Sequence, residues 1–116
     1  MGLTYIDGEV SSGKKKAKLR FLVDSGATYT LLPEIAWKSL KLKASRTLAF
    51  VLADGTRIER GVSECKIHLP QGEAHTPVIL GAAGDEPLLG AVTLEILGLV
   101  LNPFSRELQP MRMMLA

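Results

Sequence analysis

The sequence predicts a mostly β, compact, barrel-like domain with one or two short helices. Three observations predict it: apolar and polar residues alternate in several short segments, turn-forming residues separate these segments, and only two short stretches have helical character. The 116 residues have the length of one domain, so we expect residues 1–116 to fold as a single unit. A hydrophobic content of 47% supports a packed core and excludes a disordered chain.

Two strands open the predicted domain. A weak strand contains Leu3, Tyr5 and Ile6, and a stronger one covers residues 16–23, where apolar residues alternate with Lys and Arg. Two serines and a glycine at positions 11–13 supply the turn between them. We interpret the three lysines at positions 14–16 as a hairpin end that continues into the solvated face of the second strand.

A short helix and a hairpin come next. Residues 33–40 are expected to form the helix, because a proline opens the segment and a glutamate follows in its first turn. Trp37 lies in this segment and is expected to be a packing residue. Apolar residues alternate again over 48–52, and the alternation stops at Asp54-Gly55, a signal for a two-residue hairpin turn.

The second half contains shorter elements. We expect a strand over 65–69, a short strand over 78–80, a loop over 81–85, a helix over 93–97 that ends at Gly98, and a strand over 99–101. Cys65 falls on the apolar face of its strand and is expected to be a buried small hydrophobe. His68 falls on the polar face and is expected to be exposed, and His75 is expected in a loop. The tail over 111–116 is either a frayed end or part of an interface sheet.

Composition excludes several classes of function. The 14 Lys and Arg against 12 Asp and Glu leave a net charge of +2, which does not indicate a nucleic-acid partner. The single Cys65 excludes an internal disulfide and multi-cysteine zinc sites, and we predict neither a metal nor a cofactor. The most apolar stretch, 88–101, is too short to span a membrane. Without a signal sequence or a membrane partner, we expect a cytoplasmic protein.

The segment around Asp24 carries the chemistry. Asp24 follows an apolar strand, Ser25 adds a hydroxyl group, and Gly26 lets backbone approach closely. Such an arrangement exposes a carboxylate among backbone N–H donors. The alternative is a purely structural turn, in which the aspartate accepts local backbone hydrogen bonds.

A second set of residues, later in the chain, favours the functional interpretation. The chain resembles the retropepsin-like aspartic proteases, which include the retroviral proteases and their bacterial single-domain relatives. The resemblance covers residues 19–108, most of the chain, and implies a closed β-barrel. It rests on four pieces in this order: Leu22 to Thr28 with Leu31-Leu32-Pro33, Ala53-Asp54-Gly55, Leu88-Leu89-Gly90, and Leu94-Glu95.

The resemblance implies a role for each matching residue. Asp24 would be the catalytic aspartate, Ser25 would bond across a two-fold axis, and Gly26 would hold the loop and bind substrate backbone. Leu88-Leu89-Gly90 would pass behind this loop and support it, and the hairpin around Asp54 would be the flap that folds over the peptide. The residues expected to contribute to substrate binding are Ala27, Ala53, Asp54, Gly55, Leu89 and Gly90.

Two positions depart from the family pattern. Viral members usually carry an Arg after the supporting glycine and pair it with an Asp in the active-site loop. Here these places hold Ala91 and Thr28. Both partners are missing together, so neither charge is left without its partner.

Carboxylate chemistry itself requires a dimer. Peptide hydrolysis by carboxylates needs two of them about a hydrogen bond apart and sharing one proton, as the two aspartates of pepsin do. Asp24 has an apolar strand before it and Ser-Gly after it, whereas Asp7, Asp54 and Asp85 do not. Two chains related by a two-fold axis can each supply Asp24. We therefore expect a homodimer that acts on peptide or protein substrates.

Two other functions are considered. An Asp-Ser-Gly segment also marks the aspartate of subtilisin-like serine proteases, but 116 residues are too few for that fold, and His68 and His75 lack the glycine-rich setting. The remaining alternative is a catalytically silent, protease-like β domain that binds peptides or proteins as a dimer. The intact Asp24-Ser25-Gly26 argues against it, because a scaffold does not need a pair of like charges.

Overall fold

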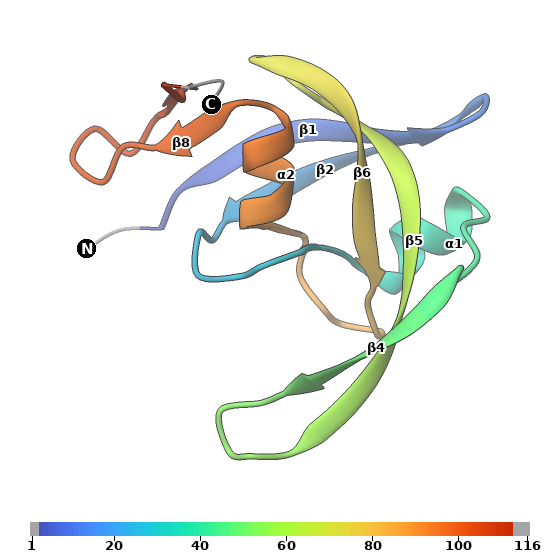
Figure 1. Cartoon of the computed structure of the whole chain (residues 1–116). Coiled ribbons are helices and arrows are strands. Elements are labelled where there is room, and N and C mark those ends of the chain that lie inside the picture. The colour runs from blue at the N-terminus through green and yellow to red at the C-terminus, as the bar shows by residue number, and fades with distance from the viewer. Residues whose placement is uncertain (1–2, 113–116) are drawn as a thin grey trace, which may run out of the picture.

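The computed structural model describes residues 3–112 and contains nine strands and two short helices (Figure 1). In chain order the elements are β1 (Tyr5–Ser12), β2 (Lys15–Val23), β3 (Thr30–Leu32), α1 (Glu34–Ser39), β4 (Arg46–Val51), β5 (Arg57–Leu69), β6 (Gly72–Leu80), β7 (Leu88–Leu89), α2 (Ala91–Ile96), β8 (Leu99–Leu101) and β9 (Leu108–Pro110).

The main sheet closes on itself. Its strands follow the order β1-β2-β7-β3-β6-β5-β4, and β1 also pairs with β5, so that six strands form a closed barrel. The closing register places Glu9 opposite His68 and Ser11 opposite Lys66. The predicted mostly β, closed barrel with two short helices is thereby confirmed. Closure removes the free sheet edges that β1 and β5 would otherwise expose.

The barrel interior is apolar because the strands alternate as the sequence predicts. Phe21 is fully buried and Val23 nearly so, whereas Arg20 next to them in the strand is exposed. Ile67 and Val78 approach from β5 and β6 and are also fully buried. Each such side chain contributes about 1.5–3 kcal/mol by leaving water. This core holds β2, and hence the loop that follows it, in a fixed position.

Both helices are close to their predicted places. In α1 Pro33 occupies the capping position, and helical geometry begins at Glu34. The second helix, α2, begins at Ala91, two residues earlier than predicted, because the buried Gly90 serves as its N-terminal cap residue. It ends at Ile96 with Leu97 as its C-terminal cap residue, and the predicted Gly98 follows the cap with a φ of +68°, a conformation that favours glycine.

Several strand predictions need correction. The first turn does not cover positions 11–13, because Ser11 and Ser12 belong to β1 and pair with β2, and Gly13 and Lys14 form the turn. His75 does not lie in a loop: β6 begins at Gly72, and His75 pairs with Lys66 of β5. The sequence did not indicate this strand because the first half of β6 is largely polar, as expected where one face of a strand is exposed to solvent. The short strands β3, β7 and β9 were not predicted, and β9 pairs with β8 in a small second sheet. Of the tail over 111–116, residues 113–116 lie outside the described part of the chain, so its role stays a prediction.

The β4–β5 hairpin projects away from the barrel (Figure 1). The prediction of a two-residue turn at its tip is wrong. The Gly55 N–H donates to the Leu52 carbonyl (2.9 Å), and the Leu52 N–H donates to the Thr56 carbonyl (2.8 Å). Only Gly55 has a positive φ, +88°, so a type I turn followed by a left-handed glycine makes a three-residue loop.

Among residues 3–112, no helix has the length and apolar character needed to cross a membrane.

Candidate active site

Asp24 stands directly beyond the end of β2, where the barrel core fixes the chain. β2 runs parallel to β7, with Leu22 opposite Leu88 and Val23 opposite Leu89. The Asp24 N–H continues this pairing by donating to the Leu89 carbonyl over 3.0 Å. The backbone of Asp24 is therefore placed by the sheet itself and not by the loop alone.

The Asp24 side chain lies at the start of a tight turn. Its Oδ1 accepts the Gly26 N–H at 3.0 Å, and its carbonyl accepts the Ala27 N–H at 3.1 Å. Asp24 is half-buried, whereas Ser25 and Gly26 are exposed. The local bond to Gly26 is the one expected of a structural turn, and it is equally compatible with a carboxylate held ready at the surface.

The segment behind the loop leaves no free space. Leu89 is fully buried, and a Cβ added to Gly90 would lie 2.5 Å from the Tyr29 carbonyl oxygen. No real Cβ approaches an atom so closely, so position 90 has room for glycine only. The Gly90 N–H donates to the Thr30 hydroxyl oxygen at 3.1 Å. The loop and its support are therefore packed backbone against backbone.

Three buried threonines extend this support into the barrel. The Thr93 hydroxyl of α2 bonds to the Thr30 hydroxyl (2.5 Å) and to the Thr76 hydroxyl (2.8 Å). All three side chains are at most 1% exposed. Sequence reasoning missed this threonine cluster, because each member sits singly in an apolar segment and only the fold brings them together.

Main-chain bonds also connect the loop to α2. The Ala91 N–H donates to the Ala27 carbonyl at 2.8 Å, and the Val92 N–H donates to the Thr28 carbonyl at 2.9 Å. Thr28 and Ala91 are the positions at which viral members carry the ion pair. In this chain, backbone hydrogen bonds join the same two segments without charged side chains.

A cleft of about 550 Å³ opens beside the loop over 24–28. The loop lines it with Ala27, Thr28 and Tyr29, and the projecting hairpin lines it with Phe50, Leu52, Ile58 and Arg60. The barrel completes it with Leu31, Ile79, Asp85 and Leu88. The lining is mostly apolar, and the volume lies within the usual range for small-ligand sites.

The predicted substrate-binding residues occupy three different environments, and the predicted catalytic residues Asp24, Ser25 and Gly26 do not line the cleft. Ala27 lines the cleft, as expected of a substrate contact. Leu89 and Gly90 are buried behind the loop, so in this structure they support it and have no surface to offer a substrate. The Ala53-Asp54-Gly55 segment is exposed at the hairpin tip and does not line the cleft.

Two aromatic residues of the cleft were not identified from the sequence. Tyr29 immediately follows the predicted motif, and Phe50 lies on the hairpin strand β4. The alternation of Leu48, Phe50 and Leu52 could have indicated an inward-facing side of this strand. It could not indicate that this side faces the active-site loop, because that contact depends on the barrel.

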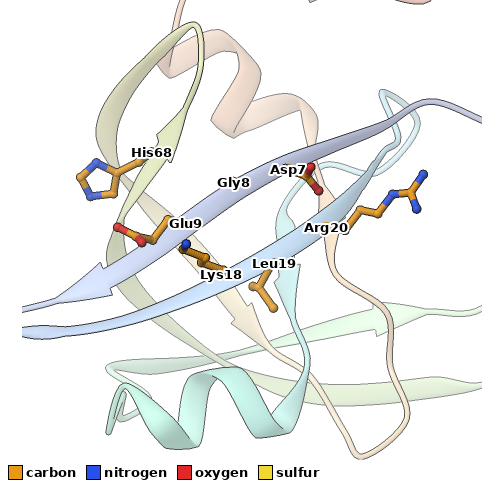
Figure 2. A pocket seen from close by; sticks show the side chains of 7 residues that line it. All are labelled: Asp7, Gly8, Glu9, Lys18, Leu19, Arg20 and His68. Carbon is orange, nitrogen blue, oxygen red and sulfur yellow. The ribbon is translucent and has the colours of Figure 1, made fainter.

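A second pocket lies over β1 and β2 and is lined by charged side chains of both signs (Figure 2). It includes Asp7 and Glu9 from β1, Lys18 and Arg20 from β2, and His68 from β5. Lys18 and Arg20 precede Asp24 by six and four residues, or about 20 and 13 Å along an extended strand. The pocket is therefore separate from the cleft beside the loop.

His68 makes an unexpected chain of polar contacts. Its Nε2 lies 3.1 Å from the Ser11 hydroxyl, and its Nδ1 lies 2.6 Å from Glu73 Oε2, which makes the expectation of an ordinary exposed histidine wrong. The order Ser-His-Glu is that of a serine hydrolase. However, Ser11 is only 8% exposed and lies within a strand paired on both sides, so no substrate carbonyl can reach it. We interpret these contacts as structural: they join β1, β5 and β6 where the barrel closes.

Other reactive groups give no further site. Cys65 is 3% exposed, and burial raises the pKa of its thiol to about 12, so it is the buried hydrophobe that was predicted. Within residues 3–112, no three or more His, Cys, Asp or Glu residues are grouped so that they could hold a metal ion.

Comparisons with known proteins agree with this geometry. The family model described as Aspartyl protease matches residues 6–93, most of the chain. Simian Foamy Virus (mac) protease is 20% identical with a TM-score of 0.59, covering 80% of this chain and 93% of its own. The EIAV protease in complex with the inhibitor HBY-793 is 19% identical with a TM-score of 0.65, covering 84% and 89%.

At these identities the two structures establish a shared fold. A search of curated proteins finds no match. The family match includes Asp24 and its loop as well as β7 and the supporting Gly90. The chain therefore belongs to the aspartyl protease family and has the retropepsin-like fold.

Proposed function

We propose that this protein is an aspartic endopeptidase that acts as a homodimer, with Asp24 of each chain forming the catalytic pair. One observation carries the proposal. Asp24 is half-buried at a loop that is fixed by backbone bonds from its own turn and from β7. A carboxylate held in a fixed position loses little conformational freedom when it pairs with the same residue of a second chain.

The other aspartates do not offer a second catalytic group within one chain. Asp7 is on the outer barrel wall, and Asp54 is at the exposed hairpin tip. Asp85 lines the cleft, but its Oδ2 accepts the Ala82 N–H at 2.7 Å and closes a loop. A dyad therefore requires a second copy of Asp24, and a two-fold axis through the two loops supplies it.

In this proposal the two carboxylates share one proton. Like charges so close cannot both be ionised, so one carboxylate acts as general base on a water molecule while the other donates to the scissile carbonyl oxygen. The proton lost by the water and the proton gained by the leaving nitrogen pass through this pair, and no covalent intermediate forms. Ser25 would bond across the axis, and the backbone at Gly26 would bind the substrate main chain.

The cleft supports a peptide as substrate. Its apolar walls suit substrate side chains, and one wall belongs to a projecting hairpin that can close over an extended chain. Ala27 and the tip residues Ala53, Asp54 and Gly55 would contact the peptide after closure. Closure excludes water from the site and strengthens the electrostatic interactions inside it.

A silent peptide-binding domain is the second candidate. The cleft is complete within one chain, so it can receive a peptide whether or not two Asp24 residues meet. In that case cleavage would be absent, while binding would remain.

Cleavage of an unfolded protein separates the two functions. We expect the wild-type chain to cleave reduced, unfolded casein at mildly acid pH and to be inhibited by a statine-type compound. Asp24→Asn should abolish cleavage while leaving the circular dichroism spectrum unchanged. The matched control is Asp7→Asn, an aspartate of the outer barrel wall away from the loop, which should cleave normally. Equal cleavage by Asp24→Asn and wild-type would refute the proposal.

A further inference from the structure

Arg60 breaks the apolar pattern of the hairpin. Along β5, Ile58, Arg60 and Val62 share one face, and Arg57 and Glu59, which alternate with them, are exposed on the other. Ile58 and Val62 are apolar and at least partly buried, as expected for an inner face. Arg60 is half-buried at the position between them, where an apolar residue would continue the pattern.

Among residues 3–112, the guanidinium group of Arg60 has a single hydrogen-bond partner. Its Nη1 donates to the Glu59 carbonyl at 3.0 Å. The ion pairs formed among residues 3–112 join Lys38 to Glu34 and Glu73 to Lys66 and His68, and do not include Arg60. Since an arginine has five N–H donors, most of its hydrogen-bonding capacity remains available.

Asp85 is the other charged residue of the cleft, but its carboxylate has a local role. Its Oδ2 accepts the Ala82 N–H at 2.7 Å and closes the loop over 81–85. It forms no ion pair with Arg60 among the described residues. Neither charged residue of the cleft forms an ion pair among the described residues, but the Asp85 carboxylate already serves to close its own loop, whereas most N–H donors of Arg60 are unused.

We propose that Arg60 is a specificity-determining residue that selects peptides with an acidic side chain at the position that enters this cleft. The inference rests on the proposed function, because it takes a peptide to be the occupant. A glutamate or aspartate carboxylate matches the planar fork of the guanidinium group. The apolar neighbours Phe50, Leu52 and Ile58 strengthen such a pair by lowering the local dielectric.

Binding to a chain that cannot cleave tests the inference directly. The probes are fluorescein-labelled octapeptides of Leu, Phe and Ser in which each position in turn is Glu, Gln or Lys. With the Asp24→Asn chain, fluorescence anisotropy should give, at one position, about tenfold tighter binding for Glu than for Gln.

Variants of Arg60 test whether the preference for Glu depends on the charge of this side chain. Arg60→Met keeps the apolar stem and should abolish the preference, and Arg60→Glu should transfer it to Lys at the same position. Arg60→Lys keeps the charge and should retain a weaker preference for Glu. Arg57→Met, on the exposed face of the same strand, is the matched control and should bind like its parent.

Each outcome decides between the inference and the function on which it rests. Binding of none of the peptides, the absence of a Glu preference, or a preference that survives Arg60→Met would overturn the inference. Cleavage of the same peptides by the wild-type chain is measured in parallel. Cleavage without a Glu preference contradicts the inference and leaves the proteolytic function standing. A Glu preference in binding without cleavage contradicts the proteolytic function and leaves the inference standing.

Discussion

The loop over 24–28 and the β4–β5 hairpin both line the cleft but are built in opposite ways. The loop over 24–28 is bonded through its backbone to β7 and to α2, and a fully buried leucine packs behind it. The tip of the hairpin, residues 51–57, is exposed throughout, and its hydrogen bonds stay within the hairpin. Catalytic groups benefit from a fixed geometry, whereas a covering element must move.

Two glycines illustrate this contrast. Gly90 is required because another backbone segment fills the space where its side chain would be. Gly55 is required because the turn needs a positive φ, although nothing lies within 4 Å of the position its Cβ would take. Substitution at the first glycine disrupts packing, and substitution at the second disrupts only the local chain path.

The largest effect is expected at position 90. Gly90→Ala places a Cβ 2.5 Å from the Tyr29 carbonyl oxygen, between segments that cannot separate without breaking the loop. We expect the free energy of unfolding to fall by about 3 kcal/mol or more and cleavage to be lost with it. Chemical denaturation measures the first effect and a casein assay the second.

The control for Gly90→Ala is Gly13→Ala in the β1–β2 turn, where no atom lies within 4 Å of the new Cβ. Its φ of +60° should cost only about 1 kcal/mol, with cleavage retained. Similar losses in the two variants would show that packing behind the loop is not what position 90 requires.

The next largest effect is expected at Gly55, where a substitution should reduce cleavage much more than stability. Gly55→Val puts a β-branched residue at a φ of +88° in the hairpin tip. Since nothing lies within 4 Å of the position that a Cβ at Gly55 would take, stability should fall by only about 1–2 kcal/mol, while casein cleavage should fall more than tenfold. The comparison fails if stability and cleavage fall in parallel, or if cleavage is unchanged.

Loss of one hydroxyl group from the threonine cluster, which supports the loop over 24–28, should lower the free energy of unfolding by an intermediate amount. Thr93→Val removes the hydroxyl that joins Thr30 and Thr76 and leaves two buried hydroxyl groups without it. We expect a loss of about 1–3 kcal/mol in the free energy of unfolding. Thr93→Ser keeps the hydroxyl and should lose less. If valine proves as stable as serine at this position, the hydrogen bonds do not support the loop.

Prediction from sequence depends on how local a pattern is. Asp24-Ser25-Gly26 and the segment ending at Gly90 were singled out because each is a pattern of residues close together in the chain, and their roles in catalysis and binding stay predictions. Two sets of contacts were missed: those of His68 with Ser11 and Glu73, and those of the threonine cluster. Both join residues that lie far apart in the chain and meet only when the barrel forms.

The hairpin was predicted in outline but not in detail. Asp54-Gly55 correctly indicated its tip, yet the turn has three residues because Asp54 keeps a negative φ and its carboxylate accepts the Thr56 N–H. The roles of Phe50 and Arg60 in the cleft depend on the direction in which the hairpin folds. That direction is set by the pairing of β5 with β1 and β6, which no local pattern encodes.

The smallest effect on stability is expected at Glu73, which lies near the closure of the barrel and away from both the loop and the hairpin. Lys66 and, to a lesser extent, His68 lower the pKa of Glu73, which is exposed. A lowered pKa in the folded state contributes stability above the ordinary glutamate pKa and loses it as the pH falls through the lowered value. Glu73→Gln should therefore be slightly less stable than wild-type at pH 7, and the difference should vanish in strong acid, below the lowered pKa.

Denaturation curves of the two proteins at several pH values measure this difference, and cleavage by Glu73→Gln should match that of wild-type. A stability difference that grows as the pH falls would contradict the assigned ion pairs.

The central claim is that each site takes Asp24 from two chains, and mixing chains tests it most directly. Wild-type and Asp24→Asn chains are combined at constant total concentration, left overnight to exchange, and assayed for cleavage. If pairing is random and mixed dimers are inactive, activity follows the square of the wild-type fraction, and an equal mixture retains about a quarter of the wild-type activity. Activity proportional to the wild-type fraction, about half in the equal mixture, would contradict the shared site even if Asp24 itself proves essential.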